Sequence, residues 1–191
     1  AEDAVAPVAL IGFAKGMEIR ASDIMLELAR RTLAATRSGP THRLTAKVTI
    51  EDEHHHLVLP EFIAPHQVIS ALIALAVGRA FDVDLATAFK RLTQLRPQRG
   101  RMRLLHGRNG SWLMDDSYNA SPTAVHAALT VLKKFPGVKR RIVVLGAMSE
   151  LGPAALAAHD DVGAAVADVA DRAVFVATPG MDIDAPAERY R

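Results

Sequence analysis

The second half of the chain contains two short apolar runs separated by a helical pattern. Residues 142–145 are an unbroken aliphatic run, residues 154–170 carry apolar positions at helical spacing, and residues 173–177 are apolar again. An unbroken aliphatic run is typical of a parallel strand that is buried on both faces. Two such strands joined by a helix predict an open α/β sheet, because parallel neighbours need a long crossover connection.

A β-hairpin and another helix are predicted just before this pattern. Residues 102–105 and 112–114 flank Asn109-Gly110, a dipeptide typical of a tight hairpin turn. Ser121-Pro122 predicts a helix start, with serine as the N-cap and proline in the first helical position. A doubly wound domain usually holds more strands than these, so we expect this α/β domain to be truncated.

The first half of the chain predicts a mixture of strands and helices. Strands are expected at residues 8–13, 44–50 and 57–59, the last two being hairpin partners across an acidic and histidine-rich turn. Helices are expected at residues 66–81 and at 84–95, where Asp84 is the N-cap. Residues 21–35 have Ile24 and Leu28 at helical spacing, although the flanks of this segment also fit strands.

The polar segment from Arg96 to Arg101 contains Pro97 and Gly100 and is the predicted domain boundary. We therefore divide the chain into domains 1–98 and 99–191. Its 191 residues fit one large or two small domains, and 50% hydrophobic residues provide enough material for a core. The net charge of +2 gives little support for a polyanionic partner such as nucleic acid.

The composition excludes structures and sites that depend on cysteine, and it disfavours a membrane protein. The absence of cysteine excludes a disulfide framework, a thiolate metal site and a cysteine nucleophile, and it is compatible with the cytosol. The longest strongly apolar stretch, residues 71–77, is much shorter than the roughly 20 residues that span a bilayer. We expect no membrane span, and the absence of an initiator methionine suggests a fragment.

Asp115, Asp116 and the following Ser117-Tyr118-Asn119 form the most distinctive polar segment. Two carboxylates follow a strand and precede a helix N-terminus, the place where open α/β sheets bind ligands and where an anion such as phosphate is favoured. The alternative is that Asp116 and Asn119 only cap the turn. From the pattern alone, both interpretations remain open.

Two other clusters have simpler explanations. The arginines at 96, 99, 101, 103 and 108 could bind phosphate, but a solvated basic linker is the interpretation that the cluster alone favours. His54, His55 and His56 are adjacent, and neighbours on a strand point to opposite faces, so we expect a solvated loop and no metal site. The sequence contains no P-loop motif and no dinucleotide-binding glycine motif.

Taken in order, several segments resemble the Mur ligase family, most closely its members that add D-alanyl-D-alanine to UDP-N-acetylmuramoyl tripeptide. The most specific is Asp115–Pro122, DDSYNASP. The others, in chain order, are IRASDI (19–24), HQVISAL (66–72), Gly100-Arg101, VLGAMSELG (144–152), and His159 followed by Val162-Gly163. The resemblance extends from about residue 10 to about residue 177.

The resemblance implies a cytoplasmic, ATP-dependent amide ligase of peptidoglycan synthesis that uses Mg²⁺. A precursor carboxylate would be phosphorylated to an acyl phosphate, which an amine then attacks. By the matched positions, Arg101 would contact ATP phosphates, Asp116 the ribose, and Gln67 and Ser70 the adenine side. Tyr118, Asn119 and Ser121 would line the substrate side. Residues 1–98 would be the end of the central ATP-binding domain, and 99–191 the start of a Rossmann-like C-terminal domain.

The chain also departs from the family pattern. Gln67 and Ser70 replace two asparagines, Ala147 replaces an aspartate, Ser121 replaces the motif's second asparagine, and the family's P-loop is missing. We therefore expect the chain alone to bind nucleotide weakly and to have no turnover. Two alternatives remain open: a Mur-like ligase for a different substrate, and a degenerate module that binds a nucleotide or a partner without catalysis.

Overall fold

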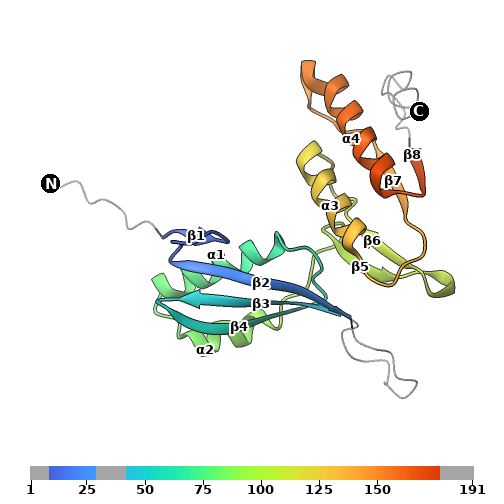
Figure 1. Cartoon of the computed structure of the whole chain (residues 1–191). Coiled ribbons are helices and arrows are strands. Elements are labelled where there is room, and N and C mark those ends of the chain that lie inside the picture. Colours follow the sequence, from blue (N-terminus) through green and yellow to red (C-terminus); the bar gives the residue numbers. More distant parts are fainter. Residues whose placement is uncertain (1–8, 29–41, 177–191) are drawn as a thin grey trace. The chain divides into compact units, whose positions relative to one another are not determined.

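The computed structural model describes residues 9–28 and 42–176 and divides the chain into two compact units. Unit 1 is Ala1–Gln98 and unit 2 is Arg99–Arg191 (Figure 1). The division falls inside the polar segment 96–101, where the sequence predicts a domain boundary. Each unit has its own sheets and its own hydrophobic core. No helix in the described ranges is long and apolar enough to cross a membrane.

Unit 1 is a four-stranded sheet with two helices packed against it (Figure 1). Its elements are β1 (Ile11–Gly12), β2 (Ile19–Leu28), β3 (His42–Ile50), β4 (Glu53–Pro60), α1 (Gln67–Ala80) and α2 (Leu85–Leu92). The strand order is β1-β2-β3-β4, in which β1 and β2 are parallel and the other neighbours are antiparallel. The predicted strands at 44–50 and 57–59 and both predicted helices are confirmed.

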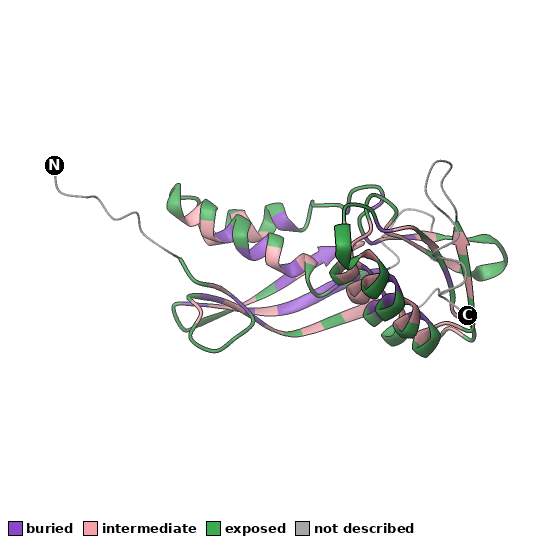
Figure 2. Cartoon of the chain, turned by 90° about the horizontal axis from the view of Figure 1, so that it is seen from above, coloured by how far each residue is buried: buried purple, intermediate pink, exposed green. Residues whose placement is uncertain are grey.

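The core of unit 1 lies between the sheet and α1. Leu44, Ala46, Val48 and Ile50 alternate along β3 and are all buried, while Leu72 of α1 is fully buried against them. Figure 2 shows buried residues in purple, and purple stretches run along both strands and helices. Burying an aliphatic side chain of this size stabilises the fold by roughly 1.5–3 kcal/mol, so the alternation of β3 fixes which face meets the helices.

The helical alternative for residues 21–35 is wrong where the structure describes that segment. Residues 21–28 belong to β2, and 29–35 lie outside the described residues. Ser22 pairs with Lys47 and Met25 with Thr45, so β2 has a bulge of two residues opposite one. Asp23, inside the bulge, has φ 50°. A bulge breaks the alternation of apolar positions, which is why the spacing resembled that of a helix.

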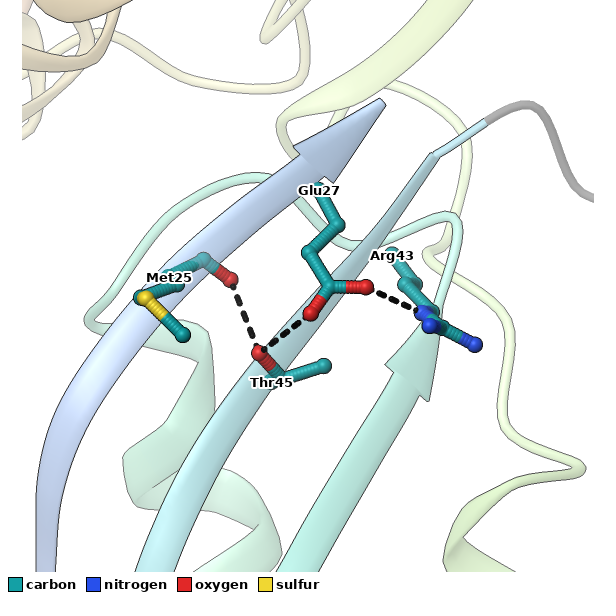
Figure 3. Close-up of polar contacts among 4 residues, drawn as sticks. All are labelled: Met25, Glu27, Arg43 and Thr45. Carbon is teal, nitrogen blue, oxygen red and sulfur yellow. Dashed lines mark hydrogen bonds and ion pairs between the residues drawn. The ribbon is translucent and has the colours of Figure 1, made fainter. Parts of the chain in front are cut away.

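A polar cluster follows the bulge (Figure 3). The buried hydroxyl of Thr45 lies 3.5 Å from both the Met25 carbonyl oxygen and Glu27 Oε1. Glu27 Oε2 also accepts a hydrogen bond from Arg43 Nε at 2.7 Å, and the two residues are direct cross-strand partners. Because buried hydroxyls need partners, this cluster favours the register that β2 and β3 adopt after the bulge.

The three adjacent histidines lie in β4, so the expectation of a solvated loop is wrong. The hairpin turn is formed by Glu51 and Asp52, both at positive φ, and the histidines pair with β3 beyond it. The pleat places His55 against Phe89 of α2, with ring centroids 5.1 Å apart, whereas His54 and His56 are exposed. Because the three rings lie on two faces of the strand, they cannot bind one metal ion together, and we still predict no metal binding there.

A smaller difference concerns the start of the chain, and the methionines differ from one another in burial. Of the predicted buried strand at 8–13, residue 8 lies outside the described residues, and within 9–13 the strand is only the two residues of β1, with Leu10 and Phe13 exposed. Met25 is exposed on β2, whereas Met102 and Met148 of unit 2 are buried.

Unit 2 contains a hairpin, two helices and a two-stranded parallel sheet (Figure 1). Its elements are β5 (Arg103–His106), β6 (Trp112–Asp115), α3 (Pro122–Lys134), β7 (Ile142–Gly146), α4 (Ala155–Val169) and β8 (Arg172–Val176), with short 3-10 turns η1 (Arg108–Gly110) and η2 (Gly152–Ala154). Asn109 and Gly110 both have positive φ in the hairpin turn, as their sequence predicts. The predicted hairpin, helices and parallel strands are therefore confirmed.

The core of unit 2 lies on one side of the parallel sheet. Leu129 of α3, Val143 of β7 and Val162 of α4 are buried together. Ile142 and Val144 point away from this core, and Val144 is 62% exposed. The prediction that residues 142–145 are buried on both faces is therefore wrong for the described residues, because α3 and α4 cover only one face of the two-stranded sheet.

Candidate functional site

The two carboxylates at the end of β6 bind the backbone of the segment that opens unit 2. Asp115 Oδ2 accepts a hydrogen bond from the Gly100 amide at 3.1 Å, and Asp116 Oδ1 accepts one from the Met102 amide at 3.0 Å. The Tyr118 amide donates to the Gly100 carbonyl, also at 3.1 Å. Three hydrogen bonds therefore join residues 100–102 to residues 115–118, although the bonded residues are 14 or more positions apart in the chain.

The backbone of residues 100–102 turns sharply around Arg101. Gly100 has φ 70° and Met102 has φ 50°, so both lie in the left-handed region. A Cβ atom on Gly100 would lie 2.9 Å from the Tyr118 nitrogen, which is closer than real contacts allow. Met102 is buried, whereas Arg101 between them is exposed. The turn thus holds the chain on both sides of Arg101 and leaves that side chain at the surface.

The guanidinium of Arg101 lies over the ring of Tyr118. The distance from Arg101 Cζ to the ring centroid is 3.9 Å, which is within the range of a cation–π contact. The Tyr118 side chain itself is largely exposed. This part of the surface therefore carries the guanidinium of Arg101 and the ring of Tyr118. The carboxylate of Asp116 lies beside them, because it binds the amide of Met102, the residue after Arg101.

Asp115 is held in its ionised form by its hydrogen bonds. The bond from Ser117 Oγ, 2.6 Å long, is the largest cause that lowers the pKa of Asp115 below its ordinary value, and the Gly100 amide lowers the pKa further. Partial burial acts in the opposite direction. Because the bonds prevail over burial, Asp115 is a carboxylate at neutral pH and can accept from both donors.

The same loop continues into α3. Asn119 Oδ1 accepts from the Ala120 amide at 2.9 Å, and Ser121 Oγ accepts from the Ala124 amide at 3.3 Å, so Ser121 is the N-cap that the sequence predicts. Asn119 therefore takes part in the turn, as the simpler interpretation expected. Asp116 does not cap this turn, because the backbone partner found for it is Met102, in the other segment.

Replacing Ser121 with alanine is expected to lower the free energy of unfolding by about 1 kcal/mol, because the Ala124 amide loses its acceptor. Thermal denaturation followed by circular dichroism measures the change. Ser121→Asp is the matched control, since its carboxylate can accept the same bond and should keep the stability near that of the original chain. Equal stability of the alanine and aspartate variants would argue against the capping role.

The seven predicted site residues fall into two groups. Arg101, Asp116 and Tyr118 are brought together by the bonds between residues 100–102 and 115–118, and Asn119 and Ser121 continue the same loop in unit 2. Gln67 and Ser70 lie on α1 of unit 1. Gln67 Oε1 accepts from the amides of Ile63 and Ala64, at 3.1 and 2.9 Å. Ser70 is exposed.

Three residues have roles that the sequence did not indicate. Asp115 and Gly100 form the bond between the two segments. His159 is buried: its Nε2 accepts from the Met148 amide at 3.2 Å, and Nδ1 contacts the Ala155 carbonyl at 2.7 Å. Because the Met148 amide can only donate, Nε2 is the unprotonated, accepting nitrogen of the ring. The ring proton is then on Nδ1, which donates to the Ala155 carbonyl. His159 thereby holds the loop after β7. The sequence pointed to His159 and to this loop only as separate family matches, and neither match indicated the contact between them.

Comparison with known proteins supports the resemblance inferred from the motifs. The family described as "Mur ligase, glutamate ligase domain" matches residues 100–190. The UDP-N-acetylmuramoyl-tripeptide–D-alanyl-D-alanine ligase of Bacillus subtilis is 32% identical over 125 residues, covering 65% of this chain and 27% of that protein. The ligase of the same name from Escherichia coli is 36% identical over 112 residues, covering 58% of this chain and 24% of that protein. The chain thus spans about a quarter of the length of these relatives.

Solved structures agree with the fold of both units. MurF from Acinetobacter baumannii is 28% identical and matches with a TM-score of 0.71, covering 92% of this chain and 35% of that one. MurF from Thermotoga maritima, solved in complex with ADP, is 23% identical with a TM-score of 0.69, covering 95% of this chain and 37% of that one; at this identity it supports the fold alone.

Proposed function

We propose, from the premise that residues 100–190 belong to the Mur ligase family, that the chain is part of an ATP-dependent amide ligase. The full-length ligase would add D-alanyl-D-alanine to UDP-N-acetylmuramoyl tripeptide, as the names of its relatives state for them. Residues 1–98 would be the end of its central ATP-binding domain, and residues 99–191 the first part of its C-terminal domain. The family resemblance also implies the cytoplasm as its compartment.

The observation that carries this proposal is the bonding of residues 100–102 to residues 115–118. The Gly-Arg pair and the DDSYN segment match the family separately, and the fold joins them through Asp115, Asp116 and Tyr118. If the two motifs had lost their function, we would not expect hydrogen bonds to hold them next to each other. The joint arrangement places a cation and a carboxylate on one surface of unit 2.

In the proposed site the two charged groups have different tasks. The planar guanidinium of Arg101 suits phosphate oxygens, to which it can donate two parallel bonds. Asp116 uses one oxygen for the Met102 amide, and a carboxylate can accept further bonds, such as those from ribose hydroxyls. The Thermotoga maritima structure was solved in complex with ADP, and a nucleotide is the ligand that we propose for this chain.

The proposed reaction has two steps. A carboxylate oxygen of the precursor attacks the γ-phosphorus of ATP, the bond to ADP breaks, and an acyl phosphate forms. The amine then attacks the acyl carbon, loses a proton and displaces phosphate, which leaves an amide. The described residues contain no group of three His, Asp or Glu side chains able to hold a metal, so we assign no residue of this chain to Mg²⁺.

A degenerate, non-catalytic module is the second candidate, and one observation favours it. The amide oxygen of Gln67, expected at the adenine side, accepts two backbone bonds from the turn before α1. A side chain used in this way has less capacity for a ligand. A module that binds only a partner protein differs from the proposed ligase in whether nucleotide binding depends on Arg101 and Asp116.

The test is the affinity of the purified 191-residue chain for ADP, measured by ligand-observed NMR, which suits weak binding. Arg101→Ala and Asp116→Ala are each expected to weaken binding about tenfold or more, since a charge-assisted bond contributes roughly 1.5–3 kcal/mol. Arg108→Ala and Asp160→Ala remove exposed charges elsewhere in unit 2 and serve as matched controls with unchanged affinity. Binding that is unaffected by Arg101→Ala and Asp116→Ala would contradict the proposed site.

A further inference from the structure

Tyr118 is an exposed aromatic residue that the core does not require. It is 70% exposed, and its ring lies under the Arg101 guanidinium, with Cζ 3.9 Å from the ring centroid. An exposed ring of this size gains little from burial, so packing in a core does not account for its contact with Arg101. The contact with Arg101 is the interaction of this ring that the structure defines.

We propose that Tyr118 is a positioning residue for Arg101: its ring holds the guanidinium in the orientation in which it meets a nucleotide phosphate. This inference rests on the proposed function of Arg101. It gives Tyr118 a task different from the substrate-side contact that the family resemblance implied. The ligand class is unchanged, a nucleoside diphosphate or triphosphate.

The backbone brings the two side chains together independently of any ligand. The Tyr118 amide donates to the Gly100 carbonyl, and the Met102 amide on the other side of Arg101 donates to Asp116. Both backbones are therefore fixed before the side chains meet. Arginine otherwise has many rotamers, and each rotamer lost on binding weakens affinity. A guanidinium already stacked on a ring loses less freedom when the phosphate arrives.

Stacking is also compatible with phosphate binding. The ring of Tyr118 contacts the face of the guanidinium, whereas the N–H donors of arginine lie in the guanidinium plane. A phosphate can therefore approach along the edge while the face stays on the ring. The negative face of the ring favours the cation without neutralising its charge. A carboxylate in the same place would compete with the phosphate for the donors.

The experiment compares ring-containing and ringless variants in two backgrounds. ADP affinity is measured by ligand-observed NMR for the original chain, Tyr118→Phe, Tyr118→Leu and Tyr118→Gln, and again with Arg101→Ala added to each. Tyr118→Phe keeps the aromatic face and should bind like the original chain. The leucine and glutamine variants should bind about threefold more weakly, the effect of an exposed cation–π contact. With Arg101→Ala present, none of the Tyr118 substitutions should change affinity further.

Each outcome has a defined meaning. Unchanged affinity in both ringless variants overturns the positioning role, as does an equal loss in the Arg101→Ala background or a loss in Tyr118→Phe. If Arg101→Ala itself leaves affinity unchanged, the proposed function fails, and the positioning role fails with it. Thermal unfolding of each variant accompanies the titrations. Because Tyr118 is exposed, the unfolding midpoints of the Tyr118 variants should stay near that of the original chain. Two ringless variants are included so that one still gives a result if the other does not fold.

Discussion

The Gly100→Ala variant is expected to lose about 2–3 kcal/mol of unfolding free energy in unit 2. Two effects combine at this position. Gly100 has φ 70°, where an L side chain is strained, and its new Cβ would lie 2.9 Å from the Tyr118 nitrogen. Relief of the clash would stretch the bond from the Tyr118 amide to the Gly100 carbonyl. Urea denaturation followed by the fluorescence of Trp112, the single tryptophan, monitors unit 2 specifically.

Gly110→Ala is the matched control for this variant. Gly110 has nearly the same backbone conformation, φ 73°, but no atom lies within 4 Å of the position of its Cβ. Alanine there should cost about 1 kcal/mol, the backbone strain without the clash. If the two variants were equally destabilised, the close approach of residues 100 and 118 would not be a feature of the folded protein.

The Asp115→Ala variant is expected to lose about 2–3 kcal/mol, because the Gly100 amide and the Ser117 hydroxyl lose a charged acceptor. Asp115→Asn is the control for shape: its oxygen can accept one bond, so the loss should be smaller. The same urea denaturation provides the measurement. Asp160→Ala, on the exposed surface of α4, should leave stability nearly unchanged. A loss at Asp115 no larger than at Asp160 would contradict the role of this carboxylate.

The contribution of the Asp115 charge should depend on pH in a defined direction. Its hydrogen bonds lower its pKa in the folded state, so the ionised form stabilises the fold. That stabilisation is complete above the unfolded-state pKa of about 3.9 and is lost as the pH falls through the lower folded-state value. The difference in stability between the original chain and Asp115→Asn should therefore shrink when the pH is lowered below about 4.

Local patterns predicted the elements of the chain well where one signal dominated. Ser121-Pro122 located the start of α3, and Asn109-Gly110 located the hairpin turn, because each dipeptide has few alternative conformations. The strand β2 was ambiguous because its bulge at Asp23 disrupts the period of two. Whether both faces of β7 are covered depends on what packs there, which the sequence of the strand does not specify.

The candidate site was predictable in its residue types but not in its internal bonds. The family resemblance pointed to Arg101 and Asp116, yet the partner of Asp116 is an amide 14 residues away. Asp115 looked equivalent to Asp116 in the sequence, and only the fold gives it a separate task at Gly100. Contacts between segments distant in the chain depend on the path of the backbone, and local patterns carry no information about that path.

The most direct test of the central claim is a titration of the isotope-labelled 191-residue chain with ADP, followed by amide chemical shifts. We expect shifts concentrated at Arg101, Asp116 and Tyr118 with their neighbours in the same two segments, and much smaller changes along α4. In the Arg101→Ala variant these shifts should require a higher ADP concentration. Shifts confined to other parts of the chain, or none at saturating ADP, would contradict a nucleotide site built from residues 100–102 and 115–118.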